Sequence, residues 1–148
     1  VLLSGVGGDD VFTGYRRHFA LTTEHWWSWL PSEIKLFLSN TSSKLNQNNL
    51  YNRRITKLFS GANLKGDDRL VNYFRWIKRS DLQKLYSLEF SSALQSSNAD
   101  SVMLDFLKDL PDNTSKLDSM LALEQQFFLA DHNLLYTDKM SMAASVEV

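Results

Sequence analysis

Cysteine is absent from the 148 residues of this chain, and proline occurs only twice. The lack of cysteine excludes disulfide bonds, a thiolate nucleophile and cysteine-ligated zinc. Long apolar runs are missing too, and none approaches the roughly 18–20 residues that a membrane-crossing helix needs. Because the formal net charge is only -1, the chain has no global field that would favour nucleic acid or an anionic membrane.

Glycine is scarce outside the beginning of the chain. Four of the six glycines lie within the first 14 residues, namely Gly5, Gly7, Gly8 and Gly14. The rest of the chain therefore has few turn-forming residues, which favours helices. The apolar residues 1–3 predict the end of a buried strand that enters a glycine-rich loop. We expect one short strand followed by a mainly helical body.

Signals for helix starts and loops recur along this body. Ser80 with Gln83, and Ser115 with Asp118, have the spacing of a capping box, in which side chains at a helix start satisfy free backbone amides. Residues 40–52 are rich in Ser, Asn, Thr and Gln and predict a surface loop.

The loop after the predicted strand has features of a phosphate site. Glycine permits positive φ and lets backbone amides approach a ligand, and a following helix adds a positive dipole end. Asp9 and Asp10 would repel bare phosphate, but they suit Mg²⁺ placed between them and the phosphates. The lysine of a P-loop and the glycine spacing of a dinucleotide fingerprint are missing. On these residues alone, a strand-to-helix turn with an aspartate cap is the simpler interpretation.

Two blocks of sequence resemble the asparagine synthetase family. Residues 3–15 read LSGVGGDDVFTGY, close to the family signature S-G-x-G-[GS]-D-E-x-F-G-G-Y. Residues 129–148 read LADHNLLYTDKMSMAASVEV and are similar to the stretch that leads into the family's E-x-R-x-P-F element. The chain opens on Val1 within an apolar run and stops within the second block. We therefore expect residues 1–148 to be a partial asparagine synthase domain, truncated at both ends.

The resemblance implies a fold and a reaction. The family's synthetase domain has the α/β ATP-pyrophosphatase fold, of the adenine nucleotide alpha hydrolase-like type, and this chain would be a mainly α fragment of it. The domain uses ATP and Mg²⁺ to adenylate a carboxylate, with aspartate the expected substrate. Ammonia from glutamine then displaces AMP and gives asparagine. The implied partners are an N-terminal glutaminase domain and a second copy in a homodimer, in the cytoplasm, with no membrane and no nucleic acid.

The resemblance also implies roles for individual residues. The implied ATP-contacting residues belong to the glycine-rich loop and are Ser4, Gly5, Gly7 and Gly8. The implied magnesium ligands are the two carboxylates that follow, Asp9 and Asp10. The implied catalytic residues lie in the second block and are Lys139, which would meet a phosphate or carboxylate, and Glu147, which would orient a cation.

Several departures from the family pattern bear on this reading. Val6 stands where asparagine-forming members often carry Glu, a residue tied to adenylate formation, so the acceptor carboxylate stays open. Asp10 stands where the family usually has Glu, and Thr13 replaces the first glycine of Gly-Gly-Tyr. The family's other pyrophosphate loop, S-G-G-x-D-S, is absent, so we expect the isolated chain to be inactive.

The middle of the chain leaves a different class of function open. From Arg53 to Lys84, nine basic residues stand against three acidic ones, with aromatic residues interleaved. This composition is compatible with RNA binding, although a solvated helical face is the simpler interpretation. The alternative to a synthetase is thus a helical interaction or nucleic-acid-binding module with an incidental glycine-rich turn.

Two further groups of residues follow the loop in sequence. Arg16 and Arg17 come directly after it, so one of them is a candidate to reach phosphate. Trp26, Trp27 and Trp29 form a dense aromatic cluster with Phe19, for which packing is the expected role and a partner-binding patch the minor one.

Overall fold

The computed structural model describes residues 5–77, 79–94 and 98–146. Within these ranges the chain is mainly helical and contains no strand, so the expected helical body is confirmed. The predicted strand at residues 1–3 lies outside the described residues, and the α/β ATP-pyrophosphatase fold stays a prediction. No described helix is long and apolar enough to cross a membrane.

The chain divides into two compact units. The first comprises Val1–Trp27 together with Asp109–Val148, and the second comprises Ser28–Lys108. The first unit therefore contains both of the sequence blocks that resemble the asparagine synthetase family.

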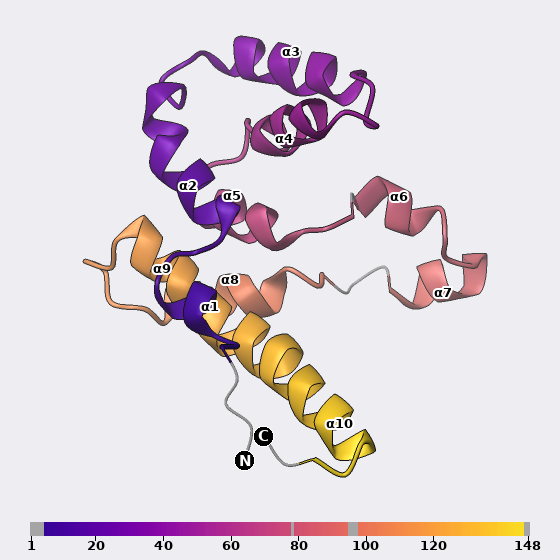
Figure 1. Cartoon of the computed structure of the whole chain (residues 1–148). Coiled ribbons are helices and arrows are strands. Elements are labelled where there is room, and N and C mark those ends of the chain that lie inside the picture. The colour runs from indigo at the N-terminus through magenta and orange to yellow at the C-terminus, as the bar shows by residue number, and fades with distance from the viewer. Residues whose placement is uncertain (1–4, 78, 95–97, 147–148) are drawn as a thin grey trace. The chain divides into compact units, whose positions relative to one another are not determined.

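The first unit is dominated by one long helix. Its elements are α1 (Gly8–Val11), α2 (Arg16–Thr23), η1 (Glu24–Trp26), α9 (Lys116–Leu123), η2 (Glu124–Leu134) and α10 (Leu135–Ala143). The last three follow one another without a break, and the middle one, η2, is wound as a π-helix; Figure 1 shows α9 leading into α10 at the end of the chain. The helix begins where the Ser115 hydroxyl accepts a hydrogen bond from the Asp118 amide at 3.1 Å, which confirms the capping-box prediction there.

The core of the first unit combines apolar and charged residues. Met120 and Leu123 of α9 are fully buried, and Leu21 of α2, the helix packed against α9, is 7% exposed. Two carboxylates, Asp10 and Glu124, are also fully buried. Buried polar groups need hydrogen-bond partners, so this core depends on polar pairing as well as on apolar packing.

The second unit consists of short helices. They are α3 (Ser32–Ser43), α4 (Leu50–Phe59), α5 (Gly66–Phe74), α6 (Arg79–Gln83), α7 (Leu88–Ala93) and α8 (Ser101–Lys108). Helix α3 packs against α4, and α5 packs against α8. The buried apolar residues are Ala62, Leu70, Val71, Tyr73 and Leu107.

Side chains of α5 hold the carboxyl end of α4. The last carbonyls of a helix have no partners within it, and here Arg69, only 4% exposed, donates to the carbonyls of Leu58, at 2.9 Å, and Ser60. The Asn72 amide also donates to the Ser60 carbonyl, at 2.9 Å. Arg69 makes a further hydrogen bond of 3.0 Å to the Tyr73 hydroxyl. These bonds fix the loop between α4 and α5.

Two local predictions were wrong. Ser80 lies inside α6 and does not cap it. The loop predicted over residues 40–52 is shorter, because α3 continues through Ser43 and α4 begins at Leu50. The hydroxyl of Ser42 donates to the Ser39 carbonyl at 3.0 Å. Such bonds to the preceding turn let serine stay in a helix.

The aromatic residues after α1 do not pack as expected. Phe19 is 72% exposed, Trp26 is 73% exposed and Trp29 is 74% exposed. The packing role predicted for these three side chains is therefore wrong, whereas Trp27, the fourth member of the cluster, is half-buried.

We expect Gly61→Ala to destabilise the second unit by about 2–3 kcal/mol, part of which is the ~1–2 kcal/mol cost of left-handed backbone. Gly61 has a φ of 67°, and a methyl group there would lie 2.7 Å from the Asn72 amide nitrogen and 2.9 Å from Leu64. The substitution would displace Asn72 from the Ser60 carbonyl. Urea unfolding measures the loss.

Gly66→Ala is the matched control. Gly66 also has a positive φ, 54°, but a methyl group there meets nothing within 4 Å. Gly66→Ala should lower the free energy of unfolding by the backbone cost alone, about 1 kcal/mol. Equal losses at the two glycines would contradict the proposed clash with Asn72.

Candidate functional site

The glycine-rich loop turns sharply at Gly7. This residue is the N-cap of α1, and its φ of 96° lies in the left-handed region that favours glycine. A methyl group at Gly7 would approach Leu129 of η2 to 3.1 Å, whereas methyl groups at Gly5 and Gly8 would meet nothing within 4 Å. The loop is thus pressed against η2 at one glycine and open at the other two. Ser4, the remaining predicted loop residue, lies outside the described residues.

The helix after the loop is shorter than the phosphate-loop interpretation assumes. Helix α1 has four residues, a single turn, so few amides align behind its positive end and its dipole is small. Any affinity of this loop for phosphate would depend on glycine amides and a cation more than on the helix.

The two predicted magnesium ligands differ in their surroundings. Asp9 is exposed and Asp10 is fully buried. The backbone amide of Gly14 donates to the Asp9 carbonyl at 3.1 Å, and a side chain at position 14 would overlap the Asp9 carboxylate. Only glycine therefore fits at position 14 while Asp9 keeps this position.

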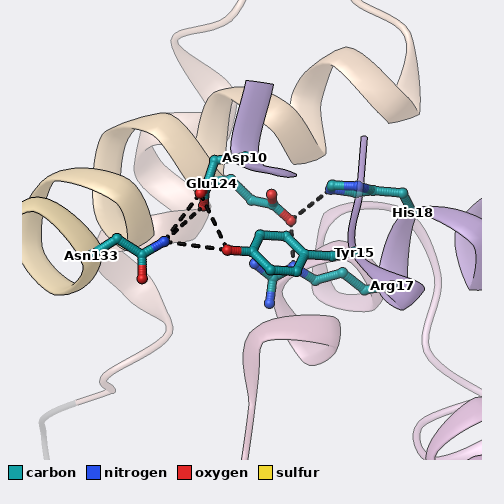
Figure 2. Close-up of polar contacts among 6 residues, drawn as sticks. All are labelled: Asp10, Tyr15, Arg17, His18, Glu124 and Asn133. Atoms are coloured by element: carbon teal, nitrogen blue, oxygen red, sulfur yellow. Dashed lines mark hydrogen bonds and ion pairs between the residues drawn. The ribbon is translucent and has the colours of Figure 1, made fainter. Parts of the chain in front are cut away.

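Asp10 links the two sequence blocks. The Tyr15 hydroxyl donates to its Oδ2 at 3.2 Å, and the Asn133 amide lies 3.1 Å from Oδ2 and 3.3 Å from Oδ1. Asn133 also donates to the Tyr15 hydroxyl at 3.3 Å, which closes a triangle of polar contacts (Figure 2). Through Asn133, the loop is bonded to the second block.

The Tyr15 hydroxyl acts as a donor in this triangle. Burial raises the pKa of Tyr15 above its usual value, the hydrogen bond from Asn133 partly opposes this shift, and the Asp10 carboxylate adds to the rise. A raised tyrosine pKa keeps the hydroxyl protonated throughout the neutral range. Tyr15 therefore stays neutral and donates a hydrogen bond to the Asp10 carboxylate.

A second buried cluster surrounds Glu124, the first residue of η2. Its Oε1 accepts hydrogen bonds from His18 Nε2, at 2.7 Å, and from Arg17 Nε (Figure 2). The Arg17 guanidinium carbon lies 4.3 Å from the ring centre of Tyr15 and 4.6 Å from that of Phe128, in cation–π contact with both. Arg17 therefore connects the Glu124 cluster to the Asp10 triangle.

The π-helical winding of η2 explains why three of its residues face the first unit's other elements. Hydrogen bonds from residue i to i+5 give a wider helix than the α form, with more than four residues per turn. Glu124, Leu129 and Asn133 are spaced at five and four residues, so this winding places them on one face. They contact His18, Gly7 and Asp10 respectively. π-Helical turns frequently occur at functional sites.

The other candidates from the sequence lie apart from these clusters or outside the described range. Lys139 is exposed on α10, and Glu147 lies outside the described residues. Arg17, one candidate for reaching phosphate, is paired with Glu124, and Arg16 is exposed. Within the described part of the chain, no three metal-ligating side chains form a cluster.

Sequence reasoning missed Glu124 as a site residue. The available signal was a carboxylate in helical register with apolar residues, since Met120 lies four residues before it and Phe128 four residues after it. A charge on an apolar helix face is buried only with partners, and those partners, Arg17 and His18, lie on α2, more than a hundred residues earlier in the chain.

Comparison with known families identifies the chain's relatives. The family model described as asparagine synthase matches residues 1–148, the entire chain. No curated protein and no solved structure matches it.

We expect Thr13→Gly to stabilise the first unit. Thr13 is β-branched and has a φ of 63°, in a left-handed conformation that costs about 1–2 kcal/mol. Glycine removes this strain but loses about 0.5–1 kcal/mol through greater freedom of the unfolded chain, so the net gain should be about 0.5–1 kcal/mol. Thr41→Gly, within α3, should instead lose about 0.5 kcal/mol. Thermal unfolding separates the two, and a loss at Thr13 would refute the strain.

We expect Glu124→Gln to destabilise the first unit by about 3 kcal/mol, because removing one partner of a buried ion pair leaves the other charge uncompensated. Arg17 and His18 would lose their shared carboxylate. Chemical denaturation measures the effect. Glu33→Gln, at an exposed position of α3, is the control and should change stability by less than about 0.5 kcal/mol. Similar effects at the two positions would show that the cluster does not stabilise the unit.

Proposed function

Because the chain belongs to the asparagine synthase family, whose activity is ATP-dependent amide formation, we propose that it is part of a synthetase domain that adenylates a carboxylate. Aspartate is the proposed acceptor, and ammonia derived from glutamine would displace AMP to give asparagine. The supporting observation is the hydrogen bonding of Asp10 to Asn133, because it joins the loop and the second block in one compact unit.

The loop has the properties that an ATP-binding role requires. Gly7 holds the backbone turn, while a Cβ at Gly5 or Gly8 would meet nothing within 4 Å. Backbone amides without a Cβ nearby can approach phosphate oxygens closely. We propose that these three glycines, with Ser4, contact the phosphates of ATP.

Asp9 fits a magnesium ligand better than Asp10 does. Mg²⁺ keeps several waters and takes one or two carboxylates together with substrate phosphates, and an exposed carboxylate such as Asp9 suits this arrangement. Asp10 could join only if Tyr15 and Asn133 released it, since its oxygens accept their hydrogen bonds. Bound there, the ion would neutralise charge on the leaving pyrophosphate.

The remaining roles extend the same proposal. Lys139, exposed on α10, would bind a phosphate or carboxylate of the substrates, and Glu147 would orient a neighbouring cation. Val6 lacks the carboxylate that asparagine-forming members often carry at this position. The proposal therefore includes acceptor carboxylates other than aspartate. We place the domain in a longer cytoplasmic enzyme with an N-terminal glutaminase domain and a homodimeric assembly, and we expect the isolated chain to be inactive.

A pair of substitutions at adjacent aspartates tests the proposal. In the enzyme that contains the complete domain, Asp9→Asn should reduce acceptor-dependent ATP–pyrophosphate exchange at least about a hundredfold, since electrostatic stabilisation of the transition state is lost. It should leave the melting temperature unchanged, because Asp9 is exposed. Asp10→Asn should lower the melting temperature instead, since Asp10 is buried and accepts three hydrogen bonds.

The two readouts distinguish the roles. Exchange that survives Asp9→Asn would refute the metal role of this residue. A melting temperature unaffected by Asp10→Asn would refute the structural role of the polar triangle. Exchange that requires no carboxylate acceptor would overturn the proposed reaction.

A further inference from the structure

The second unit contains a pocket of about 450 Å³ that the proposed synthetase chemistry does not use. Its walls come from α3, α4, the loop after α4 and the end of α5. Three cations line it, Arg53, Lys57 and Arg75, and none of its described lining residues is acidic. The pocket is therefore electropositive and lies within a single compact unit.

Internal hydrogen bonds hold two of the three cations in place. The Arg75 guanidinium is 31% exposed, pairs with Asp100, and lies 3.5 Å from the Asn72 side-chain oxygen. Lys57 donates to the Arg75 carbonyl, which joins α4 to the segment after α5. Asn72 in turn is bonded to Ser60. The positive wall is thus fixed before any ligand arrives, and this lowers the entropy lost on binding.

Arg53 supplies a charge that the protein does not neutralise. It lies four residues before Lys57 on α4, so both side chains share one helix face. Arg53 is exposed and, within the described part of the chain, makes no ion pair. Its guanidinium is consequently available to an anion in the pocket.

Two apolar side chains lie beside these cations. Trp76 and Ile77 follow Arg75, line the pocket, and are 75% and 48% exposed. Stacking on an exposed tryptophan ring beside cations is a common way to hold a planar base next to a bound phosphate. The Asn63 side chain also lines the pocket, and its amide can hydrogen-bond to a ring edge. The Gln47 amide nitrogen already donates to the Leu45 carbonyl and the Thr56 hydroxyl, so Gln47 offers its side-chain oxygen as an acceptor.

We propose that this pocket binds a small phosphorylated ligand with a flat ring, of the size of a nucleoside monophosphate. Arginine and lysine recognise phosphate through charge-assisted hydrogen bonds. The volume falls within the range of about 300–1,000 Å³ that is usual for small-molecule sites. The limited size of the pocket and the chain's net charge of -1 favour a small ligand over RNA, which binds along extended basic surfaces. This site is independent of the synthetase loop.

The test is a titration of the 148-residue chain with uridine monophosphate, a pyrimidine nucleotide chosen to avoid an ATP site. NMR shifts of the Trp76 indole and of the amides at residues 53–64 report the location, and the shifts also give the affinity. Uridine and inorganic phosphate should each bind at least about tenfold more weakly. Uridine keeps only the ring that would stack, and inorganic phosphate keeps only the group that the cations would bind. Shifts confined to the first unit would overturn the proposal.

Neighbouring arginines on α4 provide matched variants. Arg53→Gln should weaken uridine monophosphate binding about tenfold, the size expected for losing one charge-assisted hydrogen bond. Arg54→Gln should leave it unchanged, since Arg54 does not line the pocket and stacks over Tyr51. Trp76→Leu should weaken the binding of uridine monophosphate more than the binding of inorganic phosphate. Equal effects of Arg53→Gln and Arg54→Gln would refute the site.

An RNA octamer tests whether the pocket is part of an RNA-binding surface instead of a site for a mononucleotide. An octamer of uridylate that binds more than about a hundredfold tighter than the monophosphate, with the steep salt dependence of polyanion binding, would overturn the small-ligand proposal in favour of an RNA surface. Comparable affinities of octamer and monophosphate would support a site for a small ligand.

Discussion

The carboxylate of Asp10 is wholly excluded from solvent, and a charge in that environment needs hydrogen-bond donors within reach. Its donors come from Tyr15, close by in sequence, and from Asn133, more than a hundred residues away. The loop that carries Asp10 can therefore dock only where η2 presents Asn133. The left-handed turn at Gly7 and the exposure of Asp9 are both consistent with this docking.

The same principle recurs at the other buried charges. Glu124 joins α2 to the long helix through Arg17 and His18, and Arg69 joins α5 to the end of α4 through backbone carbonyls. Among the residues that the structure describes, each unit has few fully buried apolar side chains. Charged residues that must find their partners thus define which elements pack together, and apolar contacts fill the space between them.

Features that depend on neighbouring residues could be predicted from the sequence. The Ser115 cap is one, because its partner Asp118 lies three residues away, and the glycine-rich turn is another, because positive φ favours glycine. The difference in exposure between Asp9 and Asp10 could not be predicted, since it depends on where η2 places Asn133. Nor could the π-helical winding, because apolar spacing in the sequence fits an ordinary α-helix equally well.

The unbroken helix from α9 through η2 to α10 has a mechanical consequence. Asn133 and Lys139 stand six residues apart on it, and a helix transmits displacement along its axis without absorbing it in a hinge. The loop bonded to Asn133 and the cation carried by α10 are therefore attached to one continuous helix. If the loop moved towards a ligand, the helix would therefore pass that displacement from Asn133 to Lys139.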